Sequence, residues 1–164
     1  MEHIAKIENN LFLGSLFSIT PETLQEYNIT YIFHFGFEIP KPILDNDYFC
    51  KSCKHEHFDL EDNSQSVTEM LKISYYVIEK IGKLINTETI LVCCVAGKSR
   101  SASMVALYLH HKYPELSYEE IINDRIHRFR SISINQTFSE AIIKIIGDGR
   151  RMGGILREPM VPPI

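Results

Sequence analysis

The stretch that decides the fold is Thr89-Ile90-Leu91-Val92-Cys93-Cys94-Val95-Ala96-Gly97-Lys98-Ser99-Arg100-Ser101. It opens with a short apolar run bounded by polar residues, which predicts a strand buried on both faces. The residues from Ser101 to Tyr113 are rich in Ala, Met, Leu and Val, which predicts a helix. A buried strand, a tight loop and a helix in this order are typical of an α/β fold.

The loop between the two elements predicts a phosphate-binding cup. A helix N-terminus presents free N–H groups and partial positive charge, so a loop wrapped around it can hold a phosphate dianion. Arg100 can clamp two phosphate oxygens, and Cys94 lies at the base of the cup as a thiolate nucleophile aimed at phosphorus. The residues expected to bind phosphate are Val95, Ala96, Gly97, Lys98, Ser99 and Arg100.

Two other interpretations apply to the same loop. Gly97-Lys98-Ser99 matches the end of a nucleotide-binding P-loop, but that motif requires a glycine five positions before Gly97, where Val92 stands. The second interpretation is a buried Cys-Cys strand followed by an ordinary turn, since a bare Cys-x5-Arg string is common by chance. The position between an apolar strand and a Ser-led helix favours the phosphate cup.

The rest of the chain alternates between expected strands and helices, which predicts an α/β sandwich with a mixed sheet and helices on its faces. Thr20, Ser66, Ser117 and Asn135 stand where N-caps are expected, and a glutamate three residues after each of Ser66 and Ser117 completes a capping box. Strands are expected at 4–7, 11–13, 30–35, 55–60 and 89–93, helices at 20–28, 66–84, 101–113, 117–129 and 135–145, and a loop at 36–48.

Composition fits one soluble domain. The 164 residues are 45% hydrophobic and 23% charged, and the net charge of -4 gives no general attraction to nucleic acid or anionic membranes. No apolar run approaches the roughly 20 residues that span a bilayer, and the start lacks a signal-peptide layout, so we expect a cytoplasmic or nuclear protein. We expect a catalytic domain over 1–146 and a Gly/Pro/Arg-containing tail over 147–164.

Four potential metal ligands lie within eight residues, at Cys50, Cys53, His55 and His57. A metal site is one interpretation of this spacing. The segment carries no second pair at zinc-finger spacing, and an extended backbone would point neighbouring side chains to opposite faces. We therefore expect no metal and no cofactor.

The residues from Val92 to Ser103 resemble the signature of the dual-specificity protein phosphatases, which has a histidine, the nucleophilic cysteine, a glycine, and an arginine followed by serine. The likeness extends beyond the loop. Residues 10–15 resemble the family's opening strand and turn, 24–35 its helix and following strand, and 135–143 its last helix, with Ile134 in place of the usual proline. The resemblance implies the compact form of the protein tyrosine phosphatase fold, with a mainly parallel sheet.

The resemblance also implies a two-step reaction. Cys94 attacks phosphorus to form a phosphocysteine, while Arg100 and the loop amides hold the equatorial oxygens. The family's general acid is an aspartate roughly thirty residues before the cysteine, on a loop after a strand, and Asp62 has this position; Asp59 and Glu61 are nearby alternatives. Ser101 is expected to donate a hydrogen bond to the departing thiolate.

One departure from the family pattern is Cys93, which stands where the family has a histidine that supports the nucleophile. Activity can persist without it, because the helix end and Arg100 remain, or the chain can be a weak enzyme or a phosphoprotein-binding relic. Cys93 as a redox partner of Cys94 is a third interpretation, but adjacent cysteines close only a strained ring.

The function expected first is hydrolysis of phosphotyrosine and phosphoserine/threonine in a phosphorylated protein substrate. Three alternatives use the same fold: an RNA 5′-polyphosphatase, a phosphoinositide phosphatase and a non-catalytic phosphoprotein-binding module. Lys98 adds positive charge that would suit highly charged ligands. Ser101 and Asp62 argue against the RNA enzymes, which often have threonine after the arginine and lack the acid, so we do not expect a nucleic-acid partner.

Overall fold

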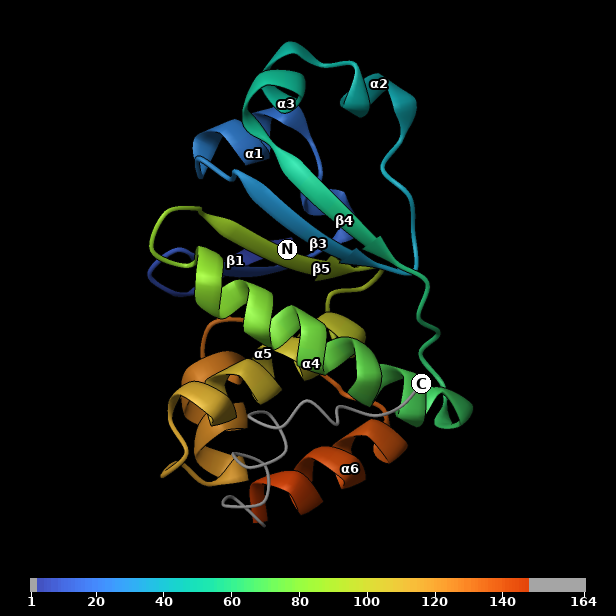
Figure 1. Ribbon diagram of the computed structural model, residues 1–164, viewed down its shortest axis with the longest axis vertical. Helices are drawn as coiled ribbons and strands as arrows, with labels where there is room; N and C mark the ends of the chain where they lie inside the picture. The colour runs from blue at the N-terminus through green and yellow to red at the C-terminus, as the bar shows by residue number, and fades with distance from the viewer. Residues whose placement is uncertain (1–2, 148–164) are drawn as a thin grey trace.

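The computed structural model describes residues 3–147 and shows a five-stranded sheet between two layers of helices (Figure 1). The strand order is β1-β2-β5-β3-β4; β1 pairs antiparallel with β2, and the other three pairings are parallel. The expected mixed, mainly parallel sheet is confirmed. The strands are β1 (Ile4–Glu8), β2 (Leu11–Ser15), β3 (Tyr31–Phe35), β4 (Lys54–Phe58) and β5 (Ile90–Cys94).

The helices divide between the two faces of the sheet (Figure 1). The larger apolar core lies against α4, α5, η3 and α6, and a smaller one lies under α1, α2 and α3. None of the helices within residues 3–147 is long and apolar enough to cross a membrane. The helices are η1 (Leu16–Ser18), α1 (Pro21–Glu26), α2 (Lys41–Leu44), α3 (Asp47–Ser52), η2 (Ser64–Ser66), α4 (Val67–Leu84), α5 (Arg100–Lys112), the π-type η3 (Glu120–His127) and α6 (Gln136–Gly147).

The β5–loop–α5 unit lies at the centre of the fold. All five residues of β5 are buried, with β2 on one side and β3 on the other. In α5 every residue from Ser101 to His110 is buried, as expected for a helix packed on several sides. The loop between them is therefore fixed at both ends by largely buried elements.

The sequence prediction of a loop over 36–48 is wrong, because α2 and the start of α3 lie within it. Pro42 is the second residue of α2, in the first helical turn, where a missing N–H breaks no intrahelical bond. Asn46 Oδ1 accepts the Phe49 N–H at 3.2 Å and caps α3. Prolines and Asn residues that indicate a loop therefore also start short helices here.

The capping box predicted at Ser66 is also wrong. Ser66 precedes α4, but its Oγ donates to Asn63 Oδ1 at 2.9 Å and makes no cap bond to the helix. The capping box at Ser117 is confirmed by its two reciprocal bonds with Glu120, of 2.9 and 3.1 Å. Gly147, assigned to the tail, is the last residue of α6, and the remainder of the predicted tail lies outside the described residues.

A buried histidine, His34, lies on β3 and is 1% exposed. Its Nδ1 lies 2.8 Å from Phe37 O, and a carbonyl only accepts, so Nδ1 carries the proton and Nε2 accepts from His55 Nδ1 at 3.0 Å. Burial lowers the pKa of His34 from 6.5 to about 4. His34 is therefore neutral in the folded protein at physiological pH.

This burial predicts a loss of stability in acid. Between pH 6.5 and about 4 the unfolded chain protonates His34 and the folded protein does not, so the free energy of unfolding falls as pH drops through that window. The free energy of unfolding of His34→Gln, measured with urea, should fall by about 2 kcal/mol less than that of wild type over this pH window. The exposed His111→Gln is the control, and equal acid sensitivity of wild type and His34→Gln would contradict the account.

Candidate active site

The backbone carbonyls of the loop after Cys94 are all turned outward by donors from other parts of the chain. In a trans peptide a carbonyl and the next N–H point in opposite directions, and the described residues contain no cis peptide. The N–H groups of residues 96–99 therefore point to the inner side of the loop, as a phosphate cup requires. The four bonds are Leu16 N to Val95 O (3.2 Å), Arg130 Nη2 to Ala96 O (2.9 Å), Arg130 Nε to Gly97 O (3.0 Å) and Ser133 N to Lys98 O (3.0 Å).

Gly97 allows the loop to make its sharpest turn. Its φ of +70° is in the left-handed region, and a Cβ there would lie 2.5 Å from Gly14 O. The backbone of Gly14 is itself crowded, since a Cβ on it would lie 2.7 Å from His3 O. The loop therefore packs directly on the end of β2 through two glycines.

Cys94 ends β5 at the base of this cup and is 2% exposed. Its Sγ lies 3.1 Å from Ser101 Oγ and 3.5 Å from Ser101 N. A hydroxyl and an N–H of the first turn of α5 thus meet the sulfur, and both stabilise negative charge on it. The structure therefore brings Cys94 and Ser101 together as the sequence predicts.

Cys93 lies on the opposite face of β5 from Cys94. Cys93 belongs to the apolar cluster under α1 and α3, while Cys94 belongs to the cluster under α4 and α5. Burial raises the pKa of the Cys93 thiol well above its usual value. Because its side chain is neutral, fully buried and turned away from Cys94, Cys93 packs as a small strand residue beside His34 of β3.

Arg100 begins α5 and is held on the side of the cup. Its Nη1 donates to Leu60 O at 2.9 Å, at the end of the segment that carries Asp62. Its Nε is buried and has no hydrogen-bond partner among residues 3–147. Buried donors are almost always paired, so an acceptor such as a phosphate oxygen would satisfy this nitrogen.

The position of Arg100 depends on Gly36. Gly36 has φ of +80°, and a Cβ on it would lie 2.0 Å from Arg100 Nη1. We predict that Gly36→Ala lowers kcat/KM for an aryl phosphate by roughly 10²-fold, because displacing a phosphate clamp by about 1 Å misaligns the reaction. Gly82→Ala is the matched control, since nothing lies within 4 Å of its Cβ. Equal activity of the two variants would refute this role of Gly36.

Two side chains at the cup, those of Ser99 and Asn135, donate hydrogen bonds to Asp62. Its Oδ1 accepts from Ser99 Oγ at 2.6 Å and from Asn135 Nδ2 at 2.7 Å, and the Asn135 N–H donates to Ser99 Oγ at 2.9 Å. Among the described residues, both donors reach the same oxygen, so Oδ2 is the atom available to carry a proton. This arrangement fits a general acid held in one orientation at the rim.

Within residues 3–147, no hydrogen bond joins Asp59 or Glu61, the two alternatives to Asp62, to the cup. Glu61 Oε2 accepts from Asn63 Nδ2 at 3.1 Å, within its own loop. Asp59 is exposed, and no hydrogen bond among the described residues links it to the phosphate loop. Lys98 is also exposed, as a rim position predicts.

The Cys50–His57 segment does not form a metal site in the described structure. Cys50 Sγ donates to Leu44 O at 2.8 Å, and Cys53 Sγ donates to Ile29 O at 3.1 Å, so the two thiols serve different carbonyls. Within residues 3–147 no group of three or more His, Cys, Asp or Glu side chains is arranged to hold a metal ion.

The sequence does not predict the roles that two side chains, those of Arg130 and Asn135, have in the site. Arg130 holds two loop carbonyls from a distance of more than thirty positions in the sequence, and no local pattern indicates such a contact. Asn135 was predicted only as the cap of α6, which it is through its bond to Phe138 N at 2.9 Å. Its side-chain nitrogen also holds Asp62, so one residue serves the helix and the site.

Known proteins resemble this chain throughout the domain. A Dictyostelium discoideum protein named as a probable dual specificity protein phosphatase is 29% identical over 104 residues, which are 63% of this chain and 35% of that protein. The match thus spans about a third of that relative's length. The crystal structure of DUSP15 superposes with a TM-score of 0.76 at 20% identity, covering 96% of each chain. That of PTPMT1 in complex with PI(5)P gives 0.68 at 23% identity, covering 92% of this chain and 98% of the other.

The two structural likenesses support the fold, and the family follows from the sequence itself. The sequence model described as "Dual specificity phosphatase, catalytic domain" matches residues 11–145, which run from the start of β2 into α6 and include every residue of the site described above. This chain belongs to the dual specificity phosphatase family.

Proposed function

We propose that this protein hydrolyses phosphotyrosine and phosphoserine/threonine in proteins through a phosphocysteine intermediate. The observation that carries the proposal is the position of Cys94 Sγ, 3.1 Å from Ser101 Oγ at the base of a loop whose N–H groups face inward. Membership of the dual specificity phosphatase family supports it. The remaining side chains supply the other roles that the reaction needs.

In the first step the Cys94 thiolate attacks phosphorus, and the bond from phosphorus to the leaving oxygen breaks. The loop amides and the Arg100 guanidinium hold the equatorial oxygens, where negative charge is spread in the transition state. Asp62 gives the proton on Oδ2 to the leaving oxygen, which departs as a neutral hydroxyl. Ser99 and Asn135 keep Asp62 in place through Oδ1.

In the second step water attacks the phosphocysteine. Asp62, now a carboxylate, accepts a proton from that water, and the phosphorus–sulfur bond breaks to release phosphate. The electron pair returns to sulfur, and Ser101 Oγ stabilises the departing thiolate by a hydrogen bond. The Cys94 thiolate and the protonated Asp62 are then ready for another turnover.

A phosphoinositide phosphatase is the second candidate. The exposed Lys98 adds positive charge beside the cup, and one structural relative was solved with PI(5)P. Against this, the net charge of -4 does not attract an anionic membrane. An RNA 5′-polyphosphatase is disfavoured by the presence of Asp62 and Ser101.

A substrate panel tests the proposal. Phosphate release is measured for phosphotyrosyl and phosphothreonyl peptides, a short-chain phosphoinositide and an RNA 5′-triphosphate. We expect kcat/KM for both peptides to exceed that for the other two by at least about 10-fold, or 1.4 kcal/mol of transition-state binding. Preference for the phosphoinositide would favour the second candidate. Phosphopeptide binding without any turnover would identify a non-catalytic binding module.

A further inference from the structure

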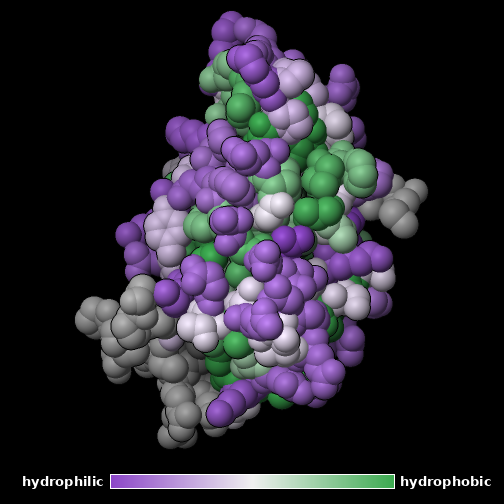
Figure 2. Space-filling model, turned by 90° about the vertical axis from the view of Figure 1, so that its right-hand side faces the viewer, coloured by the Kyte–Doolittle hydropathy of each residue, from purple (hydrophilic) through white to green (hydrophobic). Residues whose placement is uncertain are grey.

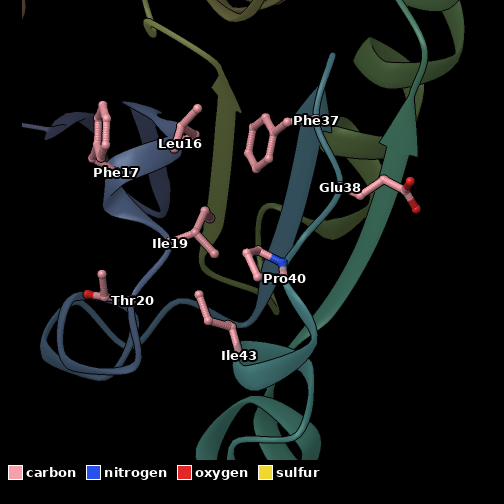
Figure 3. A pocket seen from close by; sticks show the side chains of 8 residues that line it. All are labelled: Leu16, Phe17, Ile19, Thr20, Phe37, Glu38, Pro40 and Ile43. Atoms are coloured by element: carbon pink, nitrogen blue, oxygen red, sulfur yellow. The ribbon is translucent and has the colours of Figure 1, made fainter.

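An apolar pocket of about 340 Å³ lies between two segments of the chain (Figure 3). One wall comes from η1 and the two residues that precede α1, and the other from the segment after β3 and from α2. A volume of this size lies at the small end of ligand pockets and suits one large side chain. The lining residues are Leu16, Phe17, Ile19, Thr20, Phe37, Glu38, Pro40 and Ile43.

The inner surface of this pocket is almost entirely apolar. In Figure 3, Leu16, Ile19 and Ile43 face the shared space, while the Glu38 carboxylate points away from it. Phe17 stands at the open side and is 62% exposed, which is unusual for a phenylalanine of a folded domain. No lysine or arginine is among the residues that line the pocket.

Both walls begin next to the catalytic cup. Ser15 of β2 and Phe35 of β3 are the register partners of Cys94, and Leu16 and Phe37 follow them almost at once. The Leu16 N–H also donates to Val95 O of the phosphate loop at 3.2 Å. Figure 2 looks onto the face where β3, β4 and β5 end and shows hydrophobic side chains gathered beside a largely polar region.

We propose that this pocket binds an apolar side chain of the phosphoprotein substrate, leucine- to phenylalanine-sized, within about three residues of the phosphorylated one. The proposal rests on the proposed function. The cup fixes the phosphate, and Leu16 of the pocket is hydrogen-bonded to the exposed Val95 of the cup, so a peptide extended past Val95 reaches both. A lipid chain fits the pocket less well, because no lysine or arginine is among its lining residues and the protein is net acidic, whereas phospholipid surfaces are anionic.

Binding by a Cys94→Ser protein tests the pocket independently of catalysis. Fluorescent phosphotyrosyl peptides with alanine at every flanking position are compared with peptides that carry one leucine, moved through the flanking positions in turn, by anisotropy titration. We expect one position at which leucine raises affinity about 10-fold. Ile43→Glu, added to Cys94→Ser, should abolish that gain, and Phe17→Ala should reduce it.

Ile143→Glu on α6 is the matched control, since it places the same charge on an exposed isoleucine elsewhere. It should leave the leucine gain intact. In the wild-type background, Ile43→Glu should turn over a small aryl phosphate at the normal rate, because that substrate occupies only the cup. Unchanged aryl turnover also shows that the variant is folded.

Three results would overturn the pocket proposal: no leucine position with a gain, a gain that survives both Ile43→Glu and Phe17→Ala, or a gain on lengthening the acyl chains of a phosphoinositide without one for leucine. Failure of the proposed function looks different. In that case wild type shows no turnover of aryl phosphate or phosphopeptide, while the leucine gain in the Cys94→Ser protein and its loss in Ile43→Glu persist.

Discussion

Cys94→Ser lowers kcat for both an aryl phosphate and a phosphopeptide by at least roughly 10³-fold. The serine hydroxyl stays protonated at neutral pH, and Ser101 Oγ, which lies 3.1 Å from the sulfur that it replaces, is not a base that could remove the proton. The remaining loop amides and Arg100 still hold phosphate. Stopped assays with purified protein and a coupled phosphate readout measure the loss.

The control for this variant is Cys50→Ser, which changes an exposed cysteine outside the site. It should retain wild-type turnover. Cys94→Ser should bind a phosphopeptide with wild-type or higher affinity, because serine is smaller and leaves the cup uncharged at its base. Turnover by Cys94→Ser within about tenfold of wild type would exclude Cys94 as the nucleophile.

Asp62→Asn lowers kcat by roughly 10²-fold or more for substrates with poor leaving groups, such as phosphoserine peptides. An amide cannot donate the proton that an alkoxide needs, but its oxygen can still accept from Ser99 and Asn135, so the loop keeps its place. The kcat for an activated aryl phosphate, whose leaving group needs no proton, should fall much less. Parallel kinetics on the two substrate types measure this difference.

Ser99→Ala separates positioning from proton transfer. It removes one donor to Asp62 and should lower kcat by less than Asp62→Asn does, with the same dependence on the leaving group. Asp59→Asn and Glu61→Gln are controls for the neighbouring carboxylates, which make no hydrogen bond to the cup in the part of the chain that the structure describes. A larger loss in either control than in Asp62→Asn would assign the acid to another residue.

The sequence predicts the centre of this domain well because its signals are local. The apolar run of β5, the glycine of the loop and the small residues of α5 are contiguous, and each indicates its own element. The proposed nucleophile Cys94, Arg100 and Ser101 lie within eight residues, so their proximity needs no tertiary information. Asp62 required the family resemblance, since nothing local distinguishes it from Asp59 or Glu61.

What the sequence does not predict depends on contacts between distant segments. The outward turn of the loop carbonyls relies on Leu16, Arg130 and Ser133, which come from both sides of the loop in the chain. Gly36 reads as a loop glycine, and only the structure shows that it makes room for Arg100. The pocket between η1 and α2 forms from two segments that are each unremarkable alone.

The sequence leaves open how Cys93 affects the neighbouring Cys94, and the structure shows where its side chain lies. In the sequence, Cys93 directly precedes the proposed nucleophile and stands where the family has a histidine. In the structure its thiol is buried on the opposite face of β5, next to His34, whose two nitrogens are both hydrogen-bonded. Cys93 therefore contributes packing, while the donors that meet the Cys94 sulfur come from Ser101.

The most direct test of the account is to trap the intermediate. Ser101→Ala removes the hydroxyl that stabilises the departing thiolate, so the second step slows and phosphocysteine accumulates during turnover of an aryl phosphate. After rapid denaturing quench and proteolysis, mass spectrometry should find one phosphoryl group on the peptide that contains Cys94, on its second cysteine. A phosphoryl group on another residue, or steady turnover with none on Cys94, would contradict the mechanism.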